Sequence, residues 1–251
     1  MKPTLAIVCI ALLCGCEDNA PHDAQKMALD ELLAAAPTGT AEQQFQLGMR
    51  YLRGEDVSTN AFNAAIWFRR AAMHGHSEAM FRLAECYDAS ELPESAEETM
   101  YWLRKAADSG HPRAMAFLGG KLCVSDTTKN VQEGRSWLEK SAQNGCVDGM
   151  RALARQLIEQ DKPDEARVLY RAAALKGDAR SAVFFGLSLA NAEPNSGQFI
   201  ESLAWMQVGI AGDEAIPERL MEMVEELDEK SAERLNERVK EIRMLIRQQA
   251  G

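Results

Sequence analysis

Residues 67–75 read Trp-Phe-Arg-Arg-Ala-Ala-Met-His-Gly, and four later stretches of the chain follow a related pattern that also ends in glycine. The closing glycines are 35, 35, 32 and 35 residues apart. They are Gly75, Gly110, Gly145, Gly177 and Gly212. A fixed period of this length is typical of repeat proteins, in which each repeat is one supersecondary unit.

A second marker keeps the same period. It is a large apolar residue followed by glycine or alanine, at spacings of 36, 35, 35 and 32 residues, in the pairs Leu47-Gly48, Leu83-Ala84, Leu118-Gly119, Leu153-Ala154 and Phe185-Gly186. The two markers divide each repeat into two helical stretches joined by a polar loop. One helical hairpin cannot bury its apolar face alone, so several must stack. The sequence therefore predicts an all-α fold, an α-solenoid of about five stacked helix-turn-helix repeats over residues 41–212.

Each marker has an expected physical role. The small residue of the second marker lets two helices approach closely, and the closing glycine can take the left-handed conformation that ends a helix. Thr40 and Gln43 are typical of a capping box that opens the first repeat. Later helices also have expected N-cap residues, and these are Asn60, Asn130 and Asp161.

Residues 213–251 are expected to form a C-terminal capping helix pair. Residues 216–227 are acidic, whereas residues 231–249 have apolar positions at helical spacing, with Ser231 as the expected N-cap. A solenoid needs a terminal helix with one polar face. The alternative is a coiled-coil dimer, but fewer than three heptads are present.

The first sixteen residues indicate export. Residues 1–15 contain a lysine and then an apolar run from Leu5 to Leu13, which is too short to span a bilayer and fits a signal peptide. The stretch from Leu13 to Cys16 resembles the lipobox of bacterial lipoproteins, which implies cleavage before Cys16 and its acylation, with palmitate among the expected acyl chains. Residues 16–40 would then form the lipid anchor and tether. The alternative is an ordinary secretory signal with an incidental cysteine.

The repeats resemble the Sel-one-like repeat family, a relative of the tetratricopeptide repeats. The first repeat carries the resemblance best, with Leu47-Gly48, Tyr51, Gly54 and then residues 64–75. The second repeat replaces the glycines and has a longer loop, and the fourth and fifth are degenerate. The resemblance covers about residues 41–212 and implies adaptor and assembly roles rather than one activity.

The formal net charge of −10 restricts the partners. An acidic chain does not favour nucleic acid, because phosphates need compensating Lys and Arg. It also opposes adsorption of the folded part to an anionic membrane. Membrane attachment is therefore expected through the N-terminal lipid only. The expected location is the bacterial cell envelope, at the outer membrane and facing the periplasm, because Glu17 is not the aspartate associated with inner-membrane retention in enteric bacteria.

The sequence contains no recognisable catalytic or phosphate-binding motif. His74, His76 and His111 lie at repeat ends, where the resembled family often has Gly-His, and they are not expected to bind metal. We therefore expect neither an enzyme nor a cofactor. A cell-wall or polysaccharide-acting enzyme is an alternative that only the expected compartment favours.

Three cysteines remain beyond Cys16, namely Cys86, Cys123 and Cys146. Some exported members of the resembled family join the two helices of a hairpin by a disulfide. The pair that this resemblance favours is Cys123 with Cys146, because both belong to the third repeat. The alternative is three thiols that serve as small apolar residues.

The expected function is a periplasm-facing scaffold that binds an envelope protein or peptide. Stacked hairpins curve into a superhelix whose first helices line a concave face. Basic residues occupy non-core positions of these helices and would suit an acidic partner; they are Arg50, Arg82, Lys121, Arg151 and Arg155. One alternative is that they pair with neighbouring acids and only increase solubility. Another is a structural role, as an assembly factor that organises an envelope complex through its lipid anchor.

Overall fold

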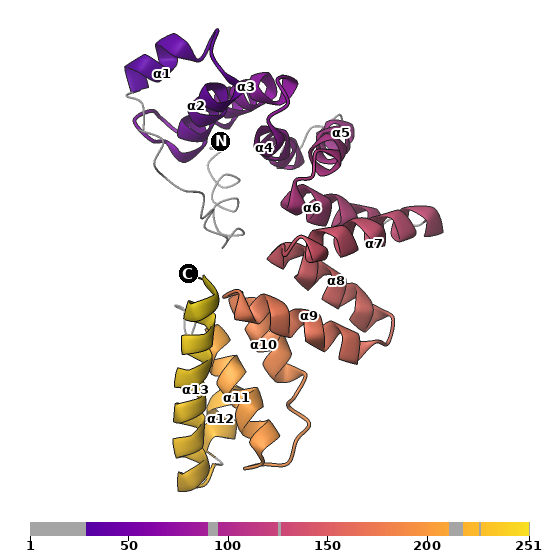
Figure 1. The fold of residues 1–251 in the computed structure, drawn as a ribbon, viewed down its shortest axis with the longest axis vertical. Helices are drawn as coiled ribbons and strands as arrows, with labels where there is room; N and C mark the ends of the chain where they lie inside the picture. Colours follow the sequence, from indigo (N-terminus) through magenta and orange to yellow (C-terminus); the bar gives the residue numbers. More distant parts are fainter. Residues whose placement is uncertain (1–28, 90–94, 125–126, 211–217, 226, 251) are drawn as a thin grey trace, which may run out of the picture. The chain divides into compact units, whose positions relative to one another are not determined.

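The computed structural model describes residues 29–89, 95–124, 127–210, 218–225 and 227–250 (Figure 1). All regular elements in these ranges are α-helices. The chain forms two compact units, residues 1–118 and residues 119–251, and the boundary falls within α6 (Pro112–Cys123). The predicted signal peptide and the predicted lipidation site, Cys16, lie outside the described residues. No described helix combines the length and the apolar character that crossing a membrane requires.

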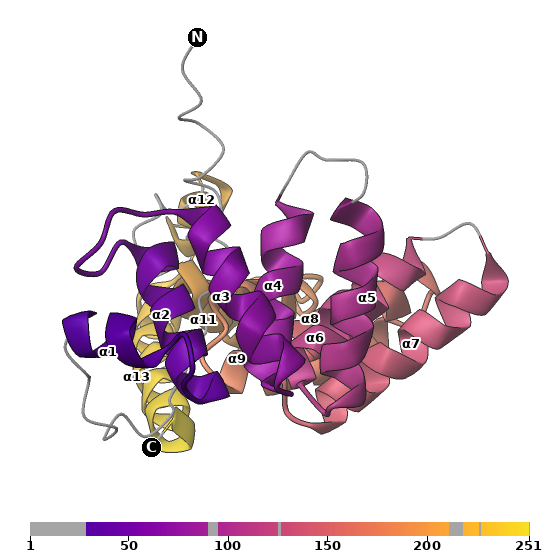
Figure 2. The same ribbon diagram turned by 90° about the horizontal axis from the view of Figure 1, so that it is seen from above.

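The first unit is built from helical hairpins (Figure 2). Two hairpins, α2–α3 and α4–α5, pack closely within themselves, and α3 also packs against α4. Phe68, Phe81 and Leu103 of these helices are completely or almost completely buried. Leu32 of α1 is buried against Leu47, so α1 packs onto the first repeat. The helices are α1 (Leu29–Ala35), α2 (Ala41–Arg53), α3 (Ala61–Met73), α4 (Ser77–Asp88) and α5 (Ser95–Asp108).

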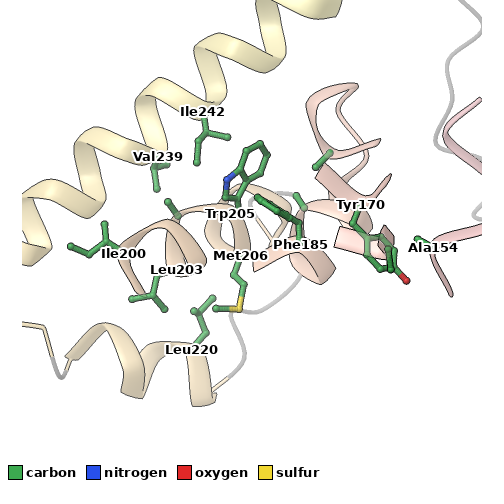
Figure 3. Close-up of a cluster of buried hydrophobic side chains, with 14 of the residues drawn as sticks. Ala154, Tyr170, Phe185, Ile200, Leu203, Trp205, Met206, Leu220, Val239 and Ile242 are labelled. Atoms are coloured by element: carbon green, nitrogen blue, oxygen red, sulfur yellow. The ribbon is translucent and has the colours of Figure 1, made fainter. Parts of the chain in front are cut away.

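The second unit continues the alternation of helices. Consecutive helices from α7 to α11 pack against one another, and α13 lies along α11. Its core contains Trp205, which meets Phe185 edge-on at 5.3 Å between ring centroids and lies near Ile242 of α13 (Figure 3). The helices are α7 (Thr128–Gln143), α8 (Val147–Glu159), α9 (Pro163–Leu175), α10 (Ala179–Leu187), α11 (Gly197–Ile210), α12 (Glu218–Glu225) and α13 (Glu229–Ala250).

This helix order confirms the predicted fold class. Five successive helix pairs correspond to the five repeats read from the sequence, and two C-terminal helices follow them. The pairs are α2–α3, α4–α5, α6–α7, α8–α9 and α10–α11.

The small residues of the second marker lie where helices approach most closely. A Cβ atom on Gly48 would lie 2.6 Å from the ring of Phe68, and one on Gly186 would lie 2.7 Å from the carbonyl oxygen of Ser202. Neither distance is compatible with a side chain, so glycine is required for this packing. The closing glycines Gly75, Gly110, Gly145 and Gly177 all have positive φ, as expected, and Gly212 lies outside the described residues.

The predicted helix starts are partly correct. Thr40 and Gln43 form the expected capping box, and the side chain of Asn60 caps α3. Asn130 is not a cap, because α7 begins earlier and Thr127 accepts a hydrogen bond from the Asn130 amide. The N-cap of α9 is Lys162 rather than Asp161. Ser231 lies inside α13, and Asp228 accepts a hydrogen bond from the Ser231 amide.

Candidate functional site

The first helices of successive repeats are joined by the side chains that begin them. His76 is the N-cap of α4, and its Nδ1 accepts a hydrogen bond of 3.1 Å from the Ala79 amide. Its Nε2 lies 3.0 Å from Oε2 of Glu42, in the first turn of α2. One histidine thus caps its own helix and contacts the preceding repeat. Its ring also stacks on Phe45 at 4.5 Å.

His111 repeats this arrangement one repeat later. Its Nδ1 accepts from the Ala114 amide at 3.1 Å, and its Nε2 is 2.6 Å from Oε2 of Glu78. The ring stacks on Phe81 at 5.0 Å. An amide can only donate, so Nδ1 must be unprotonated, and the hydrogen bond to Glu78 must then come from an Nε2–H group. The Gly-His pattern at repeat ends therefore has a structural use.

In the second unit an aspartate takes the same position. Asp178 is the N-cap of α10, and its Oδ2 accepts from the Ser181 amide at 2.9 Å. Its Oδ1 accepts from Arg151 Nη1 at 2.8 Å, and Arg151 also donates to Asp148 at 2.6 Å. The link between the first helices α8 and α10 is therefore an arginine held between two carboxylates.

Two of the five predicted basic residues are largely buried. Arg50 is only 5% exposed and lies 3.8 Å from Asp56. The side chain of Arg82 is 13% exposed and pairs with Glu78 at 2.7 Å and with Glu85 at 3.2 Å. Side chains buried to this extent expose little positive charge to a partner. Both arginines instead form ion pairs within the first unit.

The carboxylate of Glu78 is the centre of this charged cluster. Its burial alone would raise its pKa, but the hydrogen bond from His111 and the charges of Arg82, His111 and Arg113 outweigh this effect and lower the pKa to about 2. Burial raises the pKa of Glu85, because its effect outweighs that of the positive charges of Arg82 and Arg113. The cluster joins two repeats within the first unit.

The other three predicted basic residues lie in the second unit and differ in accessibility. Lys121 is half-buried near the end of α6, and Arg151 is held by its two aspartates. Arg155 is exposed, and among the residues that the structure describes it forms no ion pair. Of the five, Arg155 is therefore the one whose charge is best placed for a partner.

Two aromatic side chains belong to the same part of the second unit as Arg155. Burial raises the pKa of Tyr170, while the positive charges of Arg155 and Arg151 act in the opposite direction, so both charges lie within electrostatic range of the phenol. Phe184 of α10 stacks on Tyr170 with 5.2 Å between ring centroids and remains 47% exposed. We name Arg155, Tyr170 and Phe184 the Arg155 patch.

Phe184 was not among the residues predicted from the sequence. The signal was nevertheless present, because Phe184 and Phe185 are adjacent in a nine-residue helix. Neighbouring side chains in a helix point about 100° apart, so a helix that buries one of them in a core directs the other elsewhere. Phe185 is the one that packs against Trp205 in the core.

The structure shows no arrangement for metal chemistry in its described part, where no three His, Cys, Asp or Glu side chains form a possible metal cluster. His76 and His111 are occupied in the N-cap links, whereas His74 follows α3 as its C-cap residue.

The predicted disulfide between Cys123 and Cys146 is absent, and both residues are free thiols, as is Cys86. The physical reason is the length of α7. The Cys123 sulfur lies 3.9 Å from the carbonyl oxygen of Val131 in the first part of α7, whereas Cys146 follows the end of that helix. A helix of 16 residues is about 24 Å long, so the two thiols lie too far apart to bond.

Comparison with known proteins supports this architecture. The family model described as Sel1 repeat matches residues 41–76, 77–111, 112–146 and 150–178, which together are more than half of the chain. No curated protein matches the chain at a significant level.

Several solved structures share the fold. The protective antigen c5321 of uropathogenic Escherichia coli has a TM-score of 0.75 and 21% identity over 87% of this chain, which spans only 49% of that protein. A Sel1 repeat protein from Oxalobacter formigenes has a TM-score of 0.63 and 21% identity, covering 80% of this chain and 88% of the other. Immunity protein Pa5087 from Pseudomonas aeruginosa has a TM-score of 0.52 and 17% identity, covering 80% and 81%.

Proposed function

This chain belongs to the Sel1 repeat family, and from this membership we propose that it is a non-catalytic scaffold that binds another protein through the first-helix face of its second unit. The Arg155 patch carries the proposal. It combines an exposed arginine without an ion pair in the described chain and an exposed phenylalanine stacked on a nearly buried tyrosine. Arginine, tyrosine and phenylalanine are all enriched in protein interfaces relative to the rest of the surface.

The chemistry of the patch favours one class of partner. Arg155 attracts a carboxylate, and Phe184 offers an apolar surface held in place by Tyr170. A segment with an acidic residue next to an apolar one would satisfy both. The proposed partner is therefore a protein of the cell envelope that presents such a segment.

The proteins with the same fold are compatible with this role. Pa5087 is described as an immunity protein and c5321 as a protective antigen, so neither description names a catalytic activity. Their sequence identity to this chain is low, so the shared fold does not indicate a shared partner.

We propose further that the scaffold is held in the envelope by a lipid on Cys16, at the outer membrane and facing the periplasm. The lipobox-like residues Leu13 to Cys16 and the acidic residues directly after them support this proposal. Labelling cells with a palmitate analogue tests it, because Cys16→Ser should abolish incorporation. A Cys16→Ser protein that stays soluble yet rescues a deletion fully would exclude the alternative role as an assembly factor that needs its anchor.

Crosslinking in the source bacterium tests the binding proposal. The tagged native chain, Arg155→Glu and Phe184→Ala are crosslinked in cells, and the proteins that co-purify are identified by mass spectrometry. We expect an envelope protein that is recovered with the native chain and lost with both variants. The matched control is Lys129→Glu, which makes the same charge change at an exposed position of α7.

Equal recovery of this protein with the native chain and both patch variants would contradict the proposal. Arg151→Glu is unsuitable as the main variant, because it would place a third carboxylate beside Asp148 and Asp178 and destabilise the second unit. Circular dichroism of each purified variant confirms that a lost partner does not reflect a lost fold.

A further inference from the structure

A hollow of about 210 Å³ opens in the second unit at the point where α9 ends and α10 begins. Helices α9, α10, α11 and α13 contribute Ala174, Ala182, Val208 and Ile246, which make most of its wall apolar. Arg243 and Arg247 of α13 complete the lining on one side. None of these residues belongs to the Arg155 patch.

Two glycines shape this hollow. Gly177 has a φ of 90°, and a Cβ atom there would lie 3.8 Å from Cγ2 of Ile246, so any longer side chain would enter the space. Gly209 brings α11 against α10, because its Cβ position lies only 2.4 Å from the carbonyl oxygen of Ala179. This close approach places the neighbouring Val208 in the wall.

The charged side chains around the hollow that have no ion-pair partner in the described chain are both positive. Asp178 also lines it, but one of its carboxylate oxygens accepts from Arg151 and the other from the Ser181 amide. Arg243 and Arg247 are exposed and have no ion-pair partner within the described ranges of the chain. The last acidic residue of α13 is Glu241, and Arg238 holds it at 2.6 Å.

Stabilisation of the α13 dipole accounts for only one of these two arginines. Arg247 lies in the last turn, where a positive charge stabilises a helix. Arg243 lies one turn earlier, beyond the range in which the dipole acts strongly. Two guanidinium groups beside an apolar hollow, in a chain of net charge −10, are complementary to an anionic group joined to an apolar one.

The size of the hollow limits what can occupy it. Pockets for small molecules usually measure about 300–1,000 Å³, and this one is smaller. A single aliphatic side chain fits this volume better than a cofactor does. We propose that the hollow is a second binding site, which takes an aliphatic side chain of an acidic peptide segment while Arg243 and Arg247 bind the flanking carboxylates.

Fluorescence anisotropy with the purified full chain tests this proposal. The probe is a labelled, end-capped peptide of sequence Glu-Asp-Ile-Asp-Glu. One control peptide replaces Ile by Ser and removes the anchor, and another replaces every acid by its amide and removes the charge. We expect each control peptide to bind about tenfold more weakly than the Ile peptide. The Ser peptide loses the burial of the aliphatic side chain, and the amide peptide loses the attraction between carboxylates and arginines.

Variants locate the binding. The double variant Arg243→Ala, Arg247→Ala should weaken binding of the Ile peptide about tenfold, and Ala179→Leu should weaken it by filling the hollow from an exposed position. The matched control is Lys230→Ala, Arg234→Ala, which removes the same charge from α13 at residues that do not line the hollow. Circular dichroism checks that the helices of every variant remain intact.

Two results would overturn the proposal. One is equal binding of the Ile and Ser peptides, and the other is unchanged binding to both hollow variants. Either result leaves the Arg155 patch untouched, because the crosslinking experiment uses variants that do not alter α13. The two proposals can therefore fail separately.

Discussion

Nε2 of His111 lies 2.6 Å from Oε2 of Glu78, although the two residues are 33 positions apart in the sequence. Each belongs to the start of a first helix, and the two helices are in consecutive repeats. The N-cap of one repeat is thus bound to the first turn of the repeat before it. His76 with Glu42, and Asp178 with Arg151, make the equivalent link at other steps.

The two roles of His111 can be separated by substitution. His111→Ala removes both the cap and the link, and should lower the free energy of unfolding by about 2 kcal/mol. His111→Asn should cost about half as much, because asparagine is a good N-cap but is too short to reach Glu78. Urea unfolding followed by circular dichroism measures both. A His111→Asn variant as stable as the native chain would show that the link to Glu78 contributes nothing, whereas equal losses for the two variants would show that the cap contributes nothing.

Glu78 should make stability depend on pH. Its folded pKa of about 2 lies below the ordinary value of 4.5, so its contribution is complete above pH 4.5 and is lost as the pH falls from 4.5 towards 2. The contribution is up to about 3 kcal/mol at neutral pH. Glu78→Gln should therefore be less stable than the native chain at pH 6, and this difference should narrow by pH 3. A difference that stays constant over this range would contradict the assignment.

Two adjacent glycines of α6 should respond to alanine in opposite directions. A Cβ atom on Gly119 would lie 2.8 Å from the carbonyl oxygen of Gly134, whereas one on Gly120 would have no neighbour within 4 Å. Gly119→Ala should therefore destabilise the chain by about 1–3 kcal/mol. Gly120→Ala should stabilise it by up to about 1 kcal/mol, because alanine has the higher helix propensity. Thermal unfolding measures both changes, and a Gly119→Ala variant as stable as the Gly120→Ala variant would contradict the close approach of α6 and α7.

Cys146 is an N-cap residue without a side-chain cap. It begins α8 in an extended conformation that suits serine, but its thiol makes no capping hydrogen bond. Cys146→Ser should raise the free energy of unfolding by about 1 kcal/mol. The control is Cys123→Ser, which makes the same atomic change at the C-terminal end of α6, where no N-cap can form. Urea unfolding under reducing conditions measures both, and equal effects would exclude capping as the cause.

The features that could be predicted from the sequence are those that depend on local rules. The helix pairs follow from the two periodic markers, and Gly48 and Gly75 have the packing and backbone roles that their positions indicated. Helix starts could not all be predicted, because Thr127 and Asn130 both have side chains that can cap a helix. Only the backbone decides which of them accepts the hydrogen bond.

The sequence by itself determined that this protein is an all-α repeat protein, because the period of the small residues and closing glycines reflects interactions within each helical hairpin. The tertiary structure decided which of its charges can meet a partner. Arg50 and Arg155 both lie on first helices and looked equivalent, yet Arg50 is buried and Arg155 is exposed. Arg151 is held by Asp178, which comes from the next repeat. Charge accessibility depends on residues brought together from different repeats, and no local pattern contains that information.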